Sequence, residues 1–123
     1  MTKAQYFFGI IAVIFGLSVP AMVSAGDADF TLVNQTGYDI SEVYISPVNR
    51  RNWGRDRLGD GTLDKNKSKL FTFSDKANCN QDLKVVFDDN ASDAIWENLD
   101  LCAINKITLR YNRATKAVTA IKE

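Results

Sequence analysis

Two acidic loops carry the side chains best suited to binding a metal cation. Asp56 and Asp60 lie in the stretch NWGRDRLGDGTLDKN, and Asp88 and Asp89 follow a β-like run. Calcium takes six to eight oxygen ligands, which carboxylates from both loops and backbone carbonyls could supply. An EF-hand is excluded, because a loop starting at Asp56 has leucine at position 3 and lysine at position 12. Alternatively, these aspartates and the nearby glycines only form turns, which both residue types favour.

The first of these loops also concentrates arginine around a tryptophan. Arg51, Arg55 and Arg57 flank Trp53. Guanidinium groups beside an exposed indole ring can bind a carboxylate, a phosphate or a sugar acid, and the ring can anchor a partner protein. The alternative is a tryptophan packed in the core, which is common in a small domain. Nucleic acid is poorly supported as a partner, because acidic residues are interleaved with the arginines.

The cysteine count predicts one disulfide. Cys79 and Cys102 are the two cysteines of the chain. An even number of cysteines in an exported protein favours pairing, and closing a loop of roughly 24 residues stabilises a fold by about 3 kcal/mol. Zinc would need more ligands than two cysteines and no histidine provide.

Enzymatic chemistry is restricted by the same composition. The chain has no histidine, which excludes histidine-based triads and general bases. Oxidised cysteines cannot act as thiolate nucleophiles. Carboxylate pairs remain, for instance Asp88 with Asp93 or Glu97, but a small hydrolase built on them is the weakest hypothesis, because nothing in the spacing selects such a pair. We expect no enzymatic activity.

The N-terminus has the pattern of a secretory signal peptide. Lys3 precedes an apolar run from Tyr6 to Val19, and the small residues Ser24 and Ala25 follow. The pattern predicts cleavage after Ala25, and the run is shorter than the roughly 20 residues that span a bilayer. We therefore expect a secreted protein, periplasmic if the source is Gram-negative, without a membrane anchor after cleavage.

The remaining residues, 26–123, fit one domain. Among the 15 basic and 15 acidic residues of the chain, only Lys3 lies in the predicted signal, which leaves a formal charge of −1. This balance gives no reason to expect a polyanion or a membrane surface as a partner.

Short β-like runs separated by turn residues dominate this domain. They lie at 30–33, 42–45, 70–73, 83–87, 104–111 and 117–122. Residues 94–101 fit either a strand or a helical turn, and we favour a strand with Trp96 packed inside. The pattern predicts an all-β fold, an antiparallel β-sandwich of about six or seven short strands with one disulfide.

Several of these stretches resemble a family of small exported bacterial proteins. The stretches are FTLVNQTGYDISEVYISP, NWGRDRLG, DLKVVFDD, IWENLDLC and ITLRY. Members of that family are often labelled argininosuccinate lyase, a label that cannot describe this chain's chemistry because that enzyme is a large helical tetramer. The resemblance implies an exported β-domain with no established activity. The chain departs from the family at residues 64–68, where DKNKS replaces a Pro-Gly turn.

From these observations we expect a non-enzymatic exported domain that binds a partner protein or an envelope component. The irregular connection at residues 48–67 is the expected contact loop, because long loops in compact domains often carry function. The alternative is a calcium-binding or calcium-stabilised domain that uses the four aspartates of the two acidic loops.

Overall fold

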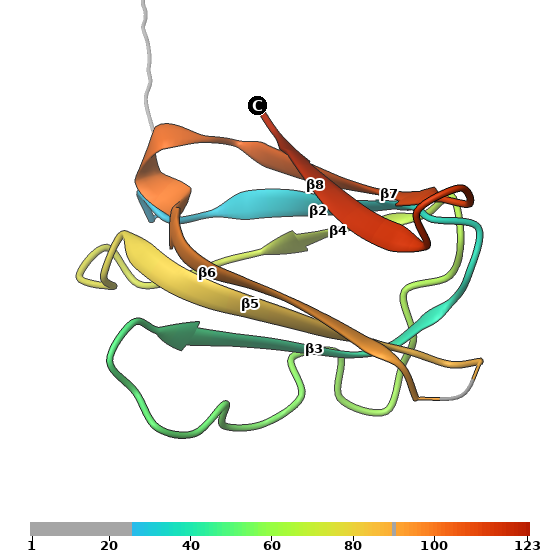
Figure 1. Cartoon of the computed structure of the whole chain (residues 1–123). Helices are drawn as coiled ribbons and strands as arrows, with labels where there is room; N and C mark the ends of the chain where they lie inside the picture. Colours follow the sequence, from blue (N-terminus) through green and yellow to red (C-terminus); the bar gives the residue numbers. More distant parts are fainter. Residues whose placement is uncertain (1–25, 90) are drawn as a thin grey trace, which may run out of the picture.

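Seven β-strands form two layers in the computed structural model, which describes residues 26–89 and 91–123 (Figure 1). The strands are β2 (Phe30–Gln35), β3 (Ile40–Pro47), β4 (Ser68–Phe71), β5 (Asn80–Phe87), β6 (Asp93–Asp100), β7 (Lys106–Asn112) and β8 (Ala117–Lys122), and a 3-10 turn, Leu101–Ala103, follows β6. The all-β prediction is confirmed. The predicted signal peptide lies outside the described residues.

Within the described ranges, no helix has the length and apolar character needed to cross a bilayer.

The two sheets differ in strand direction. One has the order β4-β2-β7-β8 and the other β3-β5-β6. All pairs are antiparallel except β2 with β7, which run parallel with Leu32 opposite Ile107. The prediction of a wholly antiparallel sandwich is therefore wrong at this pair. The reason is connectivity, because the chain passes through β3 to β6 before β7 returns beside β2.

Alternating side chains of both sheets meet in one core. On β2, Phe30, Leu32 and Asn34 are buried while their neighbours are more exposed. The buried hydrophobic cluster consists of Ala28, Phe30, Leu32, Ile40, Val43, Ile45, Leu63, Phe71, Leu83, Val85, Phe87, Leu99, Leu101, Ile107 and Leu109. The period-2 pattern thus marks the inward face of β2.

The segment left open between strand and helical turn is the strand β6. Trp96 is half-buried and packs against the core, as predicted. The pairing of β5 with β6 is irregular beside it, because Asn98 adopts a left-handed φ of 57°. Asp82 Oδ1 accepts a hydrogen bond from the Asn98 N–H at 2.8 Å, which holds this irregularity in place.

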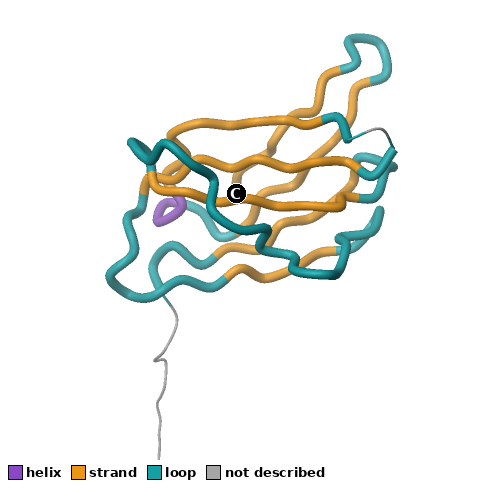
Figure 2. Tube along the Cα trace, turned by 90° about the horizontal axis from the view of Figure 1, so that it is seen from below, coloured by secondary structure: helices purple, strands orange, loops and turns teal. Residues whose placement is uncertain are grey.

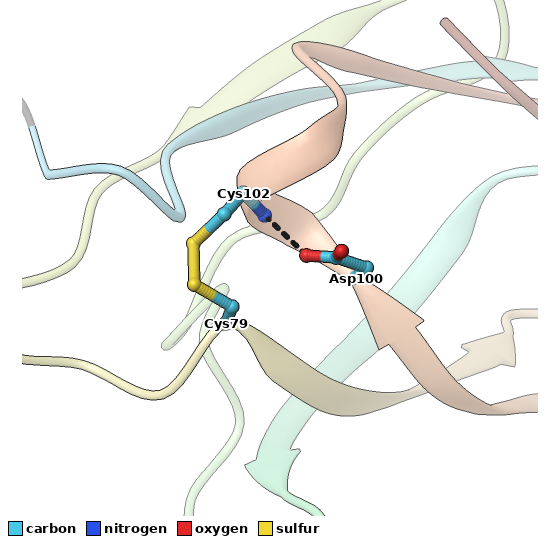
Figure 3. Close-up of side chains that lie close together, drawn as sticks. All are labelled: Cys79, Asp100 and Cys102. Atoms are coloured by element: carbon cyan, nitrogen blue, oxygen red, sulfur yellow. Dashed lines mark hydrogen bonds between the residues drawn. A yellow bond between two sulfur atoms is a disulfide. The ribbon is translucent and has the colours of Figure 1, made fainter.

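The predicted disulfide joins Cys79, just before β5, to Cys102 in the 3-10 turn (Figure 3). The two Cα atoms are 5.1 Å apart. Asp100 Oδ1 accepts a hydrogen bond from the Cys102 N–H at 3.2 Å and so caps the turn. These three side chains lie close enough together to suggest a metal site, but the bond between the sulfurs removes the thiolates that a metal would need.

Candidate binding surface

The loop at residues 48–67 is attached to the free edge of β3, which it follows in Figures 1 and 2. The Arg57 N–H donates to the Val43 carbonyl at 2.6 Å, and the Val43 N–H donates to Asp56 Oδ1 at 2.9 Å. Leu63 and Ile40 exchange two backbone hydrogen bonds, each 2.9 Å long. An unpaired strand edge presents backbone groups that need partners. The loop supplies them and is thereby held in a defined position.

The carboxylate of Asp56 belongs to this attachment. Besides the Val43 N–H, its Oδ1 accepts a hydrogen bond from the Leu58 N–H at 2.9 Å. Leu58 is half-buried and packs against the core. Asp56, predicted as a calcium ligand, therefore uses one carboxylate oxygen to shape the loop.

Arg57 also points into the fold. Its guanidinium carbon lies 4.9 Å from the ring centroid of Phe73 and 5.8 Å from that of Phe71, and its Nη2 donates to the Thr72 carbonyl at 3.3 Å. Burial lowers the pKa of Arg57, and the charge of Arg55 adds to the effect. Arg57, predicted as a partner contact, thus ties the loop to the segment after β4.

Trp53 lies over the outward face of the sheet β3-β5-β6, near Lys84 of β5. It is half-buried but is not part of the core, so it does not occupy the core position considered from the sequence. The Lys84 Nζ lies 6.0 Å from the Trp53 ring and 5.6 Å from the Tyr44 ring. Tyr44, Lys84 and Ile95 are in register on the three strands. Ile95 is 46% exposed.

Arg51 and Arg55, predicted contacts, are exposed beside Trp53. A hollow of about 140 Å³ is lined by Arg51, Trp53, Asp82 and Glu97, among others. A second, of about 200 Å³, has Trp53 and Arg55 in its wall. We call this region the Trp53 surface, and it comprises Trp53, Arg51, Arg55, Tyr44, Lys84 and Ile95.

Acidic groups border the Trp53 surface. The Tyr44 hydroxyl donates a hydrogen bond to Glu42 Oε1, which raises the pKa of Tyr44 to about 12. Lys84 forms an ion pair with Asp93, with 3.9 Å between Nζ and Oδ2. The surface therefore mixes aromatic rings with charges of both signs.

The four aspartates predicted as oxygen ligands do not converge in the described part of the chain. Asp56 lies against β3 and Asp60 is exposed in a turn, while Asp88 and Asp89 are in the connection after β5. In the described residues, 26–89 and 91–123, one group of at least three potential metal ligands has its ligand atoms within 4.8 Å of one another. That group is Cys79, Asp100 and Cys102. No three of the predicted aspartates meet that spacing, so calcium has no assembled carboxylate cage there.

A larger cavity, of about 270 Å³, lies near the other end of β3. Tyr38 and Tyr111 line it, with their rings edge to face at 5.5 Å. Asp93, one of the two alternative partners of Asp88 considered for a hydrolase, also lines this cavity, whereas the other, Glu97, lines the hollow beside Trp53. Sequence reasoning missed this cavity, because strands from both sheets bring its residues together.

Comparison with models of protein families, with curated proteins and with solved structures found no match to this chain. The resemblance to small exported bacterial proteins stays a prediction.

Proposed function

We propose that this chain is an exported, non-enzymatic binding domain whose Trp53 surface contacts a partner protein of the cell envelope. The observation that carries the proposal is the place of Trp53, a large aromatic ring held outside the core over the outward sheet face. Tryptophan, tyrosine and arginine are the residues that most often dominate binding energy at protein interfaces, and all three occur on this surface.

The attachment of the loop supports the proposal. Asp56 and Arg57 hold the segment after Trp53 against β3, and the Ser46 hydroxyl donates to the Asn52 carbonyl at 3.2 Å just before it. Anchoring on both sides limits the conformations that Trp53 would lose on binding. A surface ordered in advance loses less conformational entropy when a partner binds.

The shape and charge of the surface favour a protein over a small molecule or a polyanion. The hollows beside Trp53, of about 140 and 200 Å³, are smaller than the 300 to 1,000 Å³ of typical ligand pockets. Arg51 lies near Asp82 and Glu97, so both signs of charge are presented together. A polyanion would instead favour a continuous basic patch.

The disulfide indicates an oxidising setting outside the cytoplasm. Together with the predicted signal at residues 1–25, it supports export, and the periplasm is the proposed location if the source is Gram-negative.

The proposal is tested by photo-crosslinking in the native host. In one variant a benzophenone amino acid replaces Arg51 on the Trp53 surface. In the control variant it replaces Thr119, an exposed residue on β8 in the other sheet. We expect a discrete crosslinked adduct from position 51, none from position 119, and loss of the adduct when Trp53→Ala is added. The same adduct from both positions, or one that survives Trp53→Ala, would reject the surface.

A matched pair of variants separates binding from stability. Trp53→Ala should change the free energy of unfolding by less than about 1 kcal/mol, because the ring is outside the core; a core tryptophan would cost about 3–5 kcal/mol. Arg57→Ala should lower it by about 1–2 kcal/mol, because a half-buried guanidinium loses its ring contacts and a hydrogen bond. Thermal melts alongside the crosslinking check both.

A further inference from the structure

Gly26 occupies a position that admits only glycine. The residue is buried, and a Cβ atom built on it would lie 2.3 Å from the carbonyl oxygen of Phe73 and 3.0 Å from that of Ser74. Real Cβ atoms do not approach backbone oxygens at 2.3 Å, so any larger residue would displace the backbone. The segment that begins at Gly26 is therefore fitted against the chain after β4.

The nitrogen of Gly26 is bound to a carboxylate. It lies 3.0 Å from Asp29 Oδ2, to which it donates a hydrogen bond. The other oxygen, Oδ1, accepts a hydrogen bond from the Phe73 N–H at 2.7 Å. The Asp29 N–H in turn donates to the Gly26 carbonyl at 3.2 Å. One carboxylate thus joins the start of the domain to the segment after β4.

We propose that hydrolysis at the predicted cleavage site before Gly26 creates an α-ammonium group that forms an ion pair with Asp29. The oxygen of a water molecule bonds to the Ala25 carbonyl carbon and the C–N bond breaks. Ala25 ends in a carboxylate, and the Gly26 nitrogen takes up both protons of the water. A free α-amine has an ordinary pKa of about 7.7–8.0, so it is mostly charged at neutral pH. This inference rests on the predicted signal at residues 1–25 and does not depend on the Trp53 surface.

The consequence is a domain that gains stability when it is processed. Before cleavage, the Gly26 nitrogen is an amide that offers Asp29 one neutral donor. After cleavage, the same nitrogen would carry a positive charge, and in the structure its position lies 3.0 Å from Asp29 Oδ2. Hydrogen bonds in which both partners are ionised are stronger than those in which one is neutral. The structure therefore couples removal of the leader to a tighter fold.

Four chains that end at Glu123 test the proposal. Two begin at Gly26 and two begin at Ala25. In each pair, one chain keeps Asp29 and the other carries Asp29→Asn. All seven described strands, the disulfide and the buried core lie between Gly26 and Glu123. The chain from Ala25 keeps the Gly26 amide and moves the charge one residue outward. We expect the chain from Gly26 to melt about 2–6 °C higher, and the difference to vanish with Asp29→Asn.

A second measurement covers the case in which Asp29→Asn fails to fold. The α-amine of the folded chain from Gly26 should react with an acylating reagent at neutral pH about tenfold more slowly than that of the chain from Ala25, the effect of one pKa unit on the unprotonated fraction. Mass spectrometry of the exported protein should show Gly26 as the first residue. Equal melting temperatures with equal acylation rates, or a first residue other than Gly26, would overturn the proposal.

Discussion

Asn34 is a fully buried side chain that uses each of its polar atoms. Its Nδ2 donates hydrogen bonds to the carbonyl oxygens of Tyr38 at 2.8 Å and Leu63 at 3.0 Å. Its Oδ1 accepts hydrogen bonds from the backbone N–H of Thr36 at 3.1 Å and from the Thr36 hydroxyl at 2.7 Å. The substitution Asn34→Asp keeps the acceptor but replaces the donor with a second carboxylate oxygen. That oxygen would face two carbonyl oxygens.

The cost of this substitution follows from the lost hydrogen bonds. Each carbonyl keeps one other donor, the Thr36 hydroxyl for Tyr38 at 3.1 Å and the Ile40 N–H for Leu63 at 2.9 Å. The cost is therefore that of two lost hydrogen bonds, about 1–3 kcal/mol together, before the cost of burying a charge against two carbonyl oxygens is added. Domains of this size have total stabilities of about 5–15 kcal/mol. Burial raises the pKa of the introduced carboxyl, so the loss should be smaller near pH 4, where protonation restores a donor, and should grow as the pH rises towards 7.

Urea unfolding of the oxidised domain at pH 7 measures the effect. Asn112→Asp is the matched control, because Asn112 Oδ1 accepts hydrogen bonds from the N–H groups of Ala114 and Thr115 at 2.8 and 3.2 Å, and aspartate can accept both. We expect the control to change the unfolding free energy by less than about 0.5 kcal/mol. If the two variants agree within about 1 kcal/mol, the account of Asn34 as a buried donor is refuted.

Two further predictions concern the disulfide and a surface tyrosine. Cys79 and Cys102 are 23 residues apart, and replacing both with alanine should lower the unfolding free energy by about 3.4 kcal/mol. In calorimetry the melting temperature should fall by about 14–27 °C. A loss of unfolding free energy below about 1 kcal/mol would contradict the loop-closure argument. Tyr44 should ionise near pH 12 in difference absorbance against Tyr44→Phe, and Glu42→Gln should lower that pKa, because the Glu42 hydrogen bond is its main cause. The pKa of Tyr44 in the folded protein exceeds the unfolded value of about 10, so the contribution of its hydrogen bond to stability is present below pH 10 and lost as the pH rises towards 12. An unchanged Tyr44 pKa in Glu42→Gln would disprove that Glu42 causes the shift.

Strands were predictable from the sequence because the alternation of buried and exposed side chains is a local property. It placed each of the strands β2 to β8, including the ambiguous β6. The ends were less certain, as at β4, which is Ser68–Phe71 rather than residues 70–73. The extent of β4 depends on its pairing with β2, where Phe30 lies opposite Phe71, and a local pattern does not contain that partner.

Strand direction was not predictable in the same way. The residues of β2 and β7 have the same alternation whether their neighbours run parallel or antiparallel. Only the path of the chain through the other sheet decides that they run parallel. The cavity beside Tyr38 and Tyr111 was missed for the same reason, since its wall combines strands that are distant in the sequence.

By itself, the sequence determined the fold class, the cysteine pair and the loop at residues 48–67 as the candidate contact region, because these follow from composition and local pattern. Only the tertiary structure decided which side chains of that loop face outward. The free edge of β3 has a backbone donor and acceptor at Val43 that require partners, and Asp56 and Arg57 satisfy them. With Asp56 and Arg57 bound to β3, Trp53 is left over the outward sheet face. The loop's own sequence does not show this arrangement, because the backbone groups that need partners belong to β3.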